Sequence, residues 1–136
     1  MGTQQHRKTS TAGKVPAELS SAEYVAEIAA RMSEADLLTN VMDAAKKLGW
    51  RSYHARPART THGWRTPVQG DRAGFPDLIL LRGDRMLAVE LKRELPDVPE
   101  AQAAWLEAFM RVDWVEVEVW RPSDWLSGEI EAELLR

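Results

Sequence analysis

The chain has 136 residues, of which 44% are hydrophobic and 29% are charged, and these proportions are ordinary for one globular domain. It contains no cysteine, which excludes disulfide bridges and zinc–thiolate sites and fits a reducing compartment. No apolar run approaches the roughly 18 residues that a membrane-spanning helix requires. The N-terminal segment lacks the apolar stretch of a secretory signal. We therefore expect a cytoplasmic protein with no membrane segment.

The net charge of −3 conceals an uneven distribution along the chain. Residues 1–50 hold six basic and six acidic side chains, residues 51–93 hold nine and four, and residues 94–136 hold three and eleven. The middle segment thus carries +5 and the last segment −8. The basic segment could bind a polyanion such as a nucleic acid, or it could be a loop with no partner. Charge alone leaves both interpretations open.

The N-terminal part of the chain predicts a tail and two helices. Residues 1–19 are polar and rich in Ser, Thr and Gln, so we expect a flexible tail before a single domain over 20–136. A serine N-cap and an early glutamate predict a helix over 21–31. Ser33 then begins a capping box, and apolar residues at helical spacing continue to Leu48, where a glycine follows.

The middle of the chain predicts three strands and one long loop. Residues 50–54 are typical of a short strand. Residues 55–74 predict an irregular stretch rich in Pro, Gly, Thr and Arg, and a loop of this length in a compact domain usually has a function. Residues 76–81 and 85–92 predict two strands joined by a tight Gly-Asp turn.

The C-terminal part predicts a helix, a strand and a last short helix. Helical spacing begins at Pro99 and runs to about Arg111. Alternating valine and glutamate predict a half-buried strand over 115–119, and residues 121–124 begin the final helix. From the helix that begins at Ser33, the order helix, strand, strand, strand, helix, strand, helix indicates an α/β (α+β) fold with a mixed central sheet flanked by helices. Trp114, Trp120 and Trp125 are expected in the core or at a dimer contact.

Two carboxylates and a lysine fall close together on the predicted hairpin. Asp77 opens one strand, and Glu90 and Lys92 lie near the end of the next. Because side chains alternate along a strand, Glu90 and Lys92 share a face, and a turn at Gly83 brings Asp77 to the same end. Two adjacent carboxylates repel each other unless a cation lies between them, and Mg²⁺ takes carboxylate, water and phosphate oxygens. We expect a magnesium site, with Lys92 placed to position a water molecule or to offset negative charge.

A different interpretation of the same residues is structural. A Glu-x-Lys pattern on a strand is also typical of a surface ion pair with little energetic value, and short motifs give many false matches. The position of Asp77, at a hairpin's distance and directly after a glycine, a phenylalanine and a proline, favours the metal site.

The motif Gly74-Phe75-Pro76-Asp77, followed by Glu90-Leu91-Lys92, resembles the signature of the PD-(D/E)XK nucleases. More narrowly, residues 33–125 resemble the virus-type replication-repair nuclease (VRR-NUC) domain in its short, stand-alone phage form. In chain order, the shared features are Ser33-Glu34, Leu48-Gly49-Trp50, Tyr53-His54, the two motifs, Gln102 with Trp105-Leu106, and residues 119–124. The Glu-Leu-Lys motif is weak by itself, but the ordered set is specific.

The resemblance implies a restriction-endonuclease-like core and a set of site residues. Asp77, Glu90 and the backbone carbonyl of Leu91 would be metal ligands, and Lys92 would be the catalytic lysine. Gln102 resembles the glutamine that the family carries near the mouth of the active site, and we count it with the catalytic residues.

Glu34 and His54 each have two interpretations. Glu34 resembles the acidic residue on the family's first core helix, which would support a second metal ion or its water, but a carboxylate there also compensates the helix dipole. His54 could contact DNA or assist at the site, because its strand is expected beside that of Asp77. A lone histidine can equally be structural.

The long loop supplies the candidates for contacts with DNA. Arg56, Arg59 and Arg65 could bind phosphates, which positions a duplex without reading its sequence. Trp64 could stack on an unpaired base, or it could anchor the loop to the domain.

These expectations combine into a Mg²⁺-dependent deoxyribonuclease, with Mn²⁺ as a possible substitute. The resemblance implies branched substrates, such as Holliday junctions or flaps, and a homodimer, since symmetrical cutting by a chain with one active site needs a twofold pair. One alternative is a DNA-binding module that keeps the fold without turnover. Another is an adaptor whose acidic C-terminal part binds protein. Tight, salt-sensitive DNA binding would separate the first two from the adaptor.

Overall fold

A computed structural model describes residues 18–55, 58–65, 69–71 and 73–136, with only the backbone described at residues 58–60 and 65. In chain order, the elements are α1 (Ser21–Arg31), α2 (Glu34–Lys47), β1 (Arg51–Tyr53), β2 (Ala58–Thr60), β3 (Gly63–Arg65), β4 (Leu78–Arg82), β5 (Arg85–Leu91), α3 (Glu100–Met110), β6 (Val115–Trp120), α4 (Pro122–Leu126) and α5 (Glu129–Leu135). No helix in these ranges is long and apolar enough to cross a membrane.

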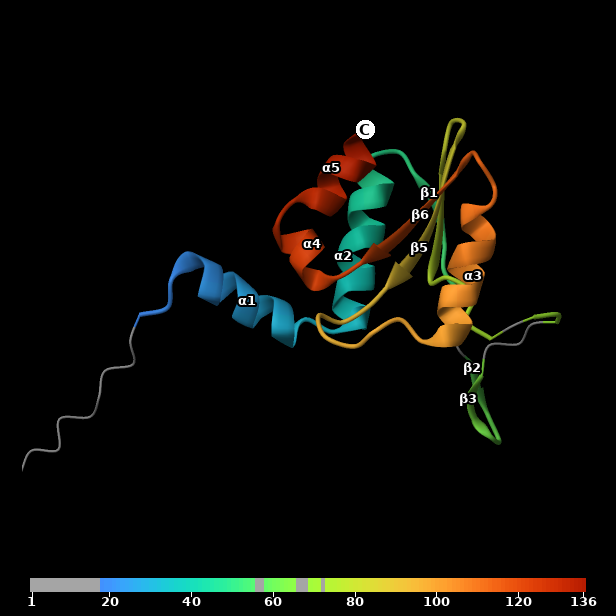
Figure 1. Ribbon diagram of the computed structural model, residues 1–136, viewed down its shortest axis with the longest axis horizontal. Coiled ribbons are helices and arrows are strands. Elements are labelled where there is room, and N and C mark those ends of the chain that lie inside the picture. The colour runs from blue at the N-terminus through green and yellow to red at the C-terminus, as the bar shows by residue number, and fades with distance from the viewer. Residues whose placement is uncertain (1–17, 56–57, 66–68, 72) are drawn as a thin grey trace, which may run out of the picture.

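The body of the molecule has three layers (Figure 1). The central sheet has the strand order β1-β4-β5-β6, with α2, α4 and α5 on one face and α3 on the other. The pairs β1–β4 and β4–β5 are antiparallel, and β5–β6 is parallel. The mixed sheet flanked by helices that the sequence predicts is therefore confirmed.

Local sequence explains where the central elements begin and turn. At the start of α2, the Ser33 hydroxyl accepts a hydrogen bond from the Asp36 N–H at 3.0 Å and the Asp36 carboxylate accepts one from the Ser33 N–H at 3.4 Å, so the predicted capping box is present. Between β4 and β5, Gly83 has a φ of +60°, which suits the first position of a two-residue hairpin turn. The chain thus returns directly and pairs β4 with β5.

Strand β5 is buried on both faces because it lies between β4 and β6 and is covered by helices on each side. Leu87, Val89 and Leu91 belong to the main core, where they pack with buried residues of α2 and α5. Side chains alternate along a strand, so Glu90 points to the opposite face, which α3 covers. One face of β5 therefore contributes apolar side chains to the core, and the other face carries the polar Glu90.

The structure corrects the expected elements at two places. Residues 55–74 are not irregular throughout, because β2 and β3 pair as a small antiparallel hairpin that projects from the body (Figure 1). Strand β3 begins directly after the turn at Gly63, which has a φ of +99°. The final helix is two helices, α4 and α5, because Gly128 takes a φ of +84° and redirects the chain between them.

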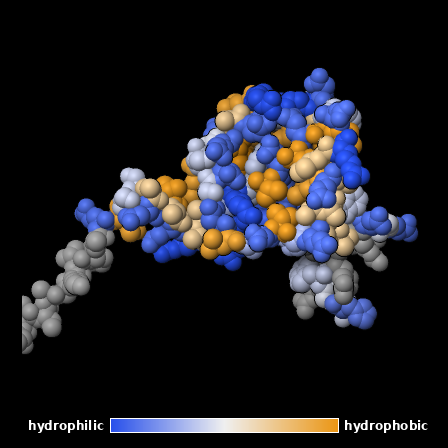
Figure 2. All heavy atoms as spheres, in the orientation of Figure 1, coloured by the Kyte–Doolittle hydropathy of each residue, from blue (hydrophilic) through white to orange (hydrophobic). Residues whose placement is uncertain are grey.

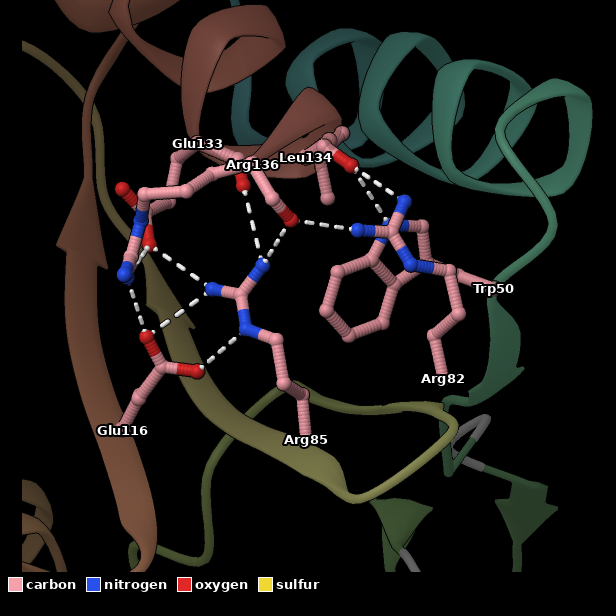
Figure 3. Close-up of polar contacts among 7 residues, drawn as sticks. All are labelled: Trp50, Arg82, Arg85, Glu116, Glu133, Leu134 and Arg136. Atoms are coloured by element: carbon pink, nitrogen blue, oxygen red, sulfur yellow. Dashed lines mark hydrogen bonds and ion pairs between the residues drawn. The ribbon is translucent and has the colours of Figure 1, made fainter.

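Three side chains hold α5 on the sheet (Figure 3). The Trp50 indole N–H and Arg82 Nη1 both donate to the carbonyl oxygen of Leu134, at 2.9 and 2.7 Å. The Arg82 and Arg85 guanidinium groups lie 4.4 and 5.1 Å from the centroid of the Trp50 ring, within the range of cation–π attraction. Carbonyls at the end of α5 that have no partner within the helix are thereby satisfied.

Arg85 also connects β5 to β6 and α5 through ion pairs (Figure 3). It lies 2.8 Å from the Glu116 carboxylate and 3.0 Å from that of Glu133. Because the Arg85 side chain is only 20% exposed, we expect Arg85→Ala to lower the free energy of unfolding by about 1–3 kcal/mol. Chemical denaturation measures this. As a control, Arg31 pairs with Glu27 at 4.0 Å but is 82% exposed, and Arg31→Ala should change stability by less than about 0.5 kcal/mol. Equal effects of the two substitutions would contradict the prediction.

Candidate active site

The start of β4 and the end of β5 meet at one end of the central sheet. Leu78 pairs with Val89 in the antiparallel register, so the preceding Asp77 lies opposite Glu90. Lys92 follows Glu90 by two residues, and its N–H donates to the carbonyl oxygen of Trp120 on β6 at 3.0 Å. The structure therefore brings together the two carboxylates and the lysine that the sequence singles out.

Asp77 is held by hydrogen bonds from both sides. Its Oδ2 accepts a hydrogen bond from the backbone N–H of Leu91 at 2.8 Å. Its backbone carbonyl lies 2.7 Å from Nδ1 of His54, at the end of β1. The carboxylate is thus oriented toward β5 while the backbone is tied to the β1 side.

Glu90 is the most strongly perturbed group of the site. Its side chain is 1% exposed. Burial raises its pKa to about 8, assisted by the negative charge of Asp77 and by a hydrogen bond with the Asp77 side chain, while Lys92 lowers it. Its Oε2 has no hydrogen-bond partner among the described residues. A buried acceptor of this kind is costly to leave unpaired, and its chemistry fits a cation.

The raised pKa of Glu90 predicts how pH changes the stability of metal-free protein. An unperturbed glutamate titrates near 4.5, and Glu90 titrates near 8 in the folded state. The folded state therefore binds the extra proton between these values, and stability falls as pH rises across that window. In buffer with a chelator, we expect the melting temperature of the wild-type protein to fall more than that of Glu90→Gln when the pH is raised from about 5 to about 9. Identical losses in the two proteins would show that Glu90 does not titrate in this range.

Lys92 is nearly as buried as Glu90, with 8% of its surface exposed. An ion pair on the surface, the alternative interpretation of the Glu-x-Lys pattern, is therefore wrong. The Lys92 ammonium group attracts the nearby carboxylates. Because solvent access is reduced here, this attraction is stronger than it would be in water.

The Gly74–Asp77 segment is fastened to α3. Gly74 has a φ of +84°, and a Cβ atom added there would lie 2.4 Å from the carbonyl carbon of Ala101 and 2.6 Å from the backbone nitrogen of Gln102. The next residue, Phe75, packs edge-on against Trp105, with ring centroids 5.0 Å apart. The motif therefore sets the position of the first turn of α3 relative to Asp77.

Gln102 lies on this first turn, at the site end of α3. Its side chain is partly buried, and its Oε1 has no hydrogen-bond partner in the described part of the chain. The structure therefore adds a second unpaired oxygen to that of Glu90. The sequence marks Gln102 as polar within an apolar stripe, but it gives no sign that Gly74 is the residue against which this turn packs.

The comparison with known families decides the identity of this arrangement. A family model described as the VRR-NUC domain matches residues 19–124 of the 136-residue chain. The chain belongs to the VRR-NUC family. This domain is part of the PD-(D/E)XK nuclease superfamily, so the mixed sheet with its flanking helices is a restriction-endonuclease-like fold, and the protein is a nuclease acting on DNA. Neither the curated proteins nor the solved structures compared with the chain give a match.

The remaining candidates that the sequence singles out are Glu34, three arginines and Trp64. Glu34, in the first turn of α2, is exposed, yet its charge helps to raise the pKa of Glu90. Arg56 lies outside the described residues. Arg59 lies on β2 and Arg65 on β3, and only the backbone of these two residues is described. Trp64 is 69% exposed, so it does not anchor the hairpin by burial.

The donor set of the VRR-NUC site can be compared with what each metal requires. Among the residues that the structure describes, no group of three or more His, Cys, Asp or Glu side chains could hold a metal ion. Two carboxylates and the Leu91 carbonyl are hard oxygen donors. Mg²⁺ binds through one or two carboxylates and keeps several waters, so this sparse set fits Mg²⁺ better than an ion that needs a full protein cage.

Proposed function

We propose that this VRR-NUC protein is a Mg²⁺-dependent endonuclease that hydrolyses phosphodiester bonds in branched DNA. The observation that carries the proposal is the trio of Asp77, Glu90 and Lys92, in which Glu90 and Lys92 are buried and Asp77 is half-buried. Glu90 has a pKa raised to about 8 and a buried oxygen without a partner in the described residues. Perturbed groups of this kind gather where a protein binds ions or performs chemistry.

Asp77, Glu90 and the backbone carbonyl of Leu91 would hold the cation. When bound, Mg²⁺ supplies Lewis acidity at the scissile phosphate and lowers the pKa of a coordinated water. The carboxylates contribute the negative charge that makes the site selective for a divalent cation. The Leu91 N–H holds Oδ2 of Asp77 at 2.8 Å, so part of the donor geometry is set before the cation arrives.

Lys92 and Gln102 would act on the DNA and the attacking water. The buried Lys92 ammonium would offset the negative charge that develops on the phosphate. The unpaired Oε1 of Gln102 can accept a hydrogen bond from water, which would orient the nucleophile near the phosphate. Neither role requires either residue to move far, since both lie on regular elements or next to them.

The preference for branched DNA and the homodimer come from the family resemblance. Helix α1 extends away from the body and carries apolar side chains on its surface (Figures 1 and 2). Tyr24, Val25 and Ile28 are 60%, 41% and 36% exposed. This exposed apolar side offers a second copy of the chain a surface to bury, and two active sites related by a twofold axis could cut a junction symmetrically.

The test is cleavage of labelled four-way junction, flap and plain duplex DNA with Mg²⁺ or Mn²⁺. Wild-type protein and Lys47→Ala, which removes an exposed lysine at the end of α2, should cut equally, and Lys92→Ala should not cut. Salt-sensitive binding without any cutting would favour the DNA-binding module instead. Absence of both would favour the adaptor. A monomeric mass in solution with paired junction cleavage would contradict the homodimer.

A further inference from the structure

His54 donates a hydrogen bond to the backbone of the first proposed metal ligand. Its Nδ1 lies 2.7 Å from the carbonyl oxygen of Asp77, and the contact is partly buried. A carbonyl oxygen can only accept, so Nδ1 carries the proton. In the neutral ring, Nε2 is then the nitrogen without a proton.

The position of this bond in the sheet explains why a side chain supplies it. Strand β1 ends at Tyr53, which pairs with Ile79. In the same register Ala55 would lie opposite Asp77, but the ladder has stopped by then. Partly buried carbonyl groups need a donor, and the His54 imidazole takes the place of the missing strand at this point.

The bond completes a two-point attachment of Asp77. The Leu91 N–H holds the carboxylate from the β5 side at 2.8 Å, and His54 holds the carbonyl from the β1 side at 2.7 Å. Asp77 precedes β4 and has no ladder partner among the residues that the structure describes. Without His54, the described part of the chain would restrain its backbone through the neighbouring residues alone.

We propose that His54 is a positioning residue whose Nδ1–H fixes the backbone of Asp77, so that the Asp77 carboxylate faces Glu90 in the geometry needed for a divalent cation. This inference rests on the proposed function, and it replaces the DNA contact expected of His54. Groups that orient metal ligands typically change metal affinity or activity by about 10- to 100-fold when removed.

Three substitutions separate the two ring nitrogens. The side-chain amide of asparagine places an N–H donor at the position of Nδ1, and the longer amide of glutamine places one near the position of Nε2. Leucine has neither. If His54 acts through Nδ1, asparagine replaces it and glutamine does not, whereas a DNA contact through Nε2 predicts the opposite order.

Two measurements on the full chain decide the matter, and the first is Mg²⁺ affinity by titration calorimetry without DNA. We expect His54→Asn to stay within about threefold of wild type and His54→Gln and His54→Leu to lose about 10- to 100-fold. Affinity for uncut junction DNA in a chelator should be the same in all four proteins. Melting temperatures identify a variant that does not fold, and the Asn and Gln pair, both polar and similar in size, still decides the question if the leucine variant fails.

The second measurement is the tautomer of His54, read from the ¹⁵N spectrum of the metal-free protein. The chain has only three histidines, so comparison with the asparagine variant assigns the signal. A proton on Nδ1 is expected. A proton on Nε2 alone, or Mg²⁺ affinity that glutamine preserves and asparagine loses, would overturn the proposal. Normal Mg²⁺ binding without cleavage of any DNA would instead refute the proposed endonuclease function and leave the role of His54 intact.

Discussion

We expect the replacement of Asp77 by asparagine to lower the cleavage rate by about a thousandfold or more and, above about pH 8, where Glu90 is ionised, to raise the melting temperature of the metal-free protein. The amide keeps an oxygen that can accept the hydrogen bond from the Leu91 N–H, but it removes one of the two negative charges that would hold the proposed cation. It also removes the charge that contributes to the raised pKa of Glu90. Cleavage rates with Mg²⁺ and thermal melts in a chelator measure the two effects separately.

Asp84 provides the matched control for this substitution. It lies in the turn of the same β4–β5 hairpin, at the opposite end from the site, and is exposed. We expect Asp84→Asn to leave both the cleavage rate and the melting temperature close to those of wild type. Above about pH 8, a lower melting temperature for Asp77→Asn would mean that the Asp77–Glu90 contact stabilises the metal-free protein, which contradicts the electrostatic argument.

Substituting Gly74 by alanine should damage both stability and activity. A side chain at a φ of +84° is strained, and its Cβ would overlap the backbone of Ala101 at 2.4 Å. Backbone atoms of a helix cannot move aside as a side-chain tip can. We expect a loss of about 2–4 kcal/mol in the free energy of unfolding, together with reduced cleavage, because the first turn of α3 carries Gln102. Denaturant titration and cleavage assays measure the two losses.

Comparison with Gly128 separates the backbone strain from the effect of steric overlap. It has the same φ of +84°, and an added Cβ would meet nothing within 4 Å. Gly128→Ala should therefore show the strain alone, about 1–2 kcal/mol, and leave cleavage unchanged. If the two alanine variants were equally stable, α3 would not be packed against Gly74 as the structure has it.

The site could be predicted from sequence as far as local periodicity reaches. Alternation places Glu90 and Lys92 on one face, and the Gly83 turn then fixes the register that puts Asp77 opposite Glu90. Local pattern cannot give the burial of Glu90, because that depends on α3 covering this face of the sheet. The same holds for the bond between His54 and Asp77, which depends on the pairing of β1 with β4 across an intervening hairpin.

The fold shows the same division between local and long-range information. Capping boxes and apolar spacing predict α1 and α2 because they are properties of one segment. The β2–β3 hairpin was missed because its strands have three residues each and no apolar alternation. Trp114 was expected in the core or at a dimer contact; the core assignment is wrong, since it is 62% exposed, whereas Trp120 is 4% exposed. The aromatic character of a residue does not by itself indicate whether its side chain faces the core or the solvent.

The burial of β5 on both faces limits the insertions and deletions that this protein can tolerate. Leu87, Val89 and Leu91 belong to the core on one face, and Glu90 belongs to the site on the other. Removing one residue from β5 ahead of Glu90 would exchange the faces, moving a carboxylate into the apolar core and a leucine into the site. Folding and chemistry would fail together. A change of two residues keeps the parity of the strand, so length variation in this region should occur in even steps or be confined to the turn.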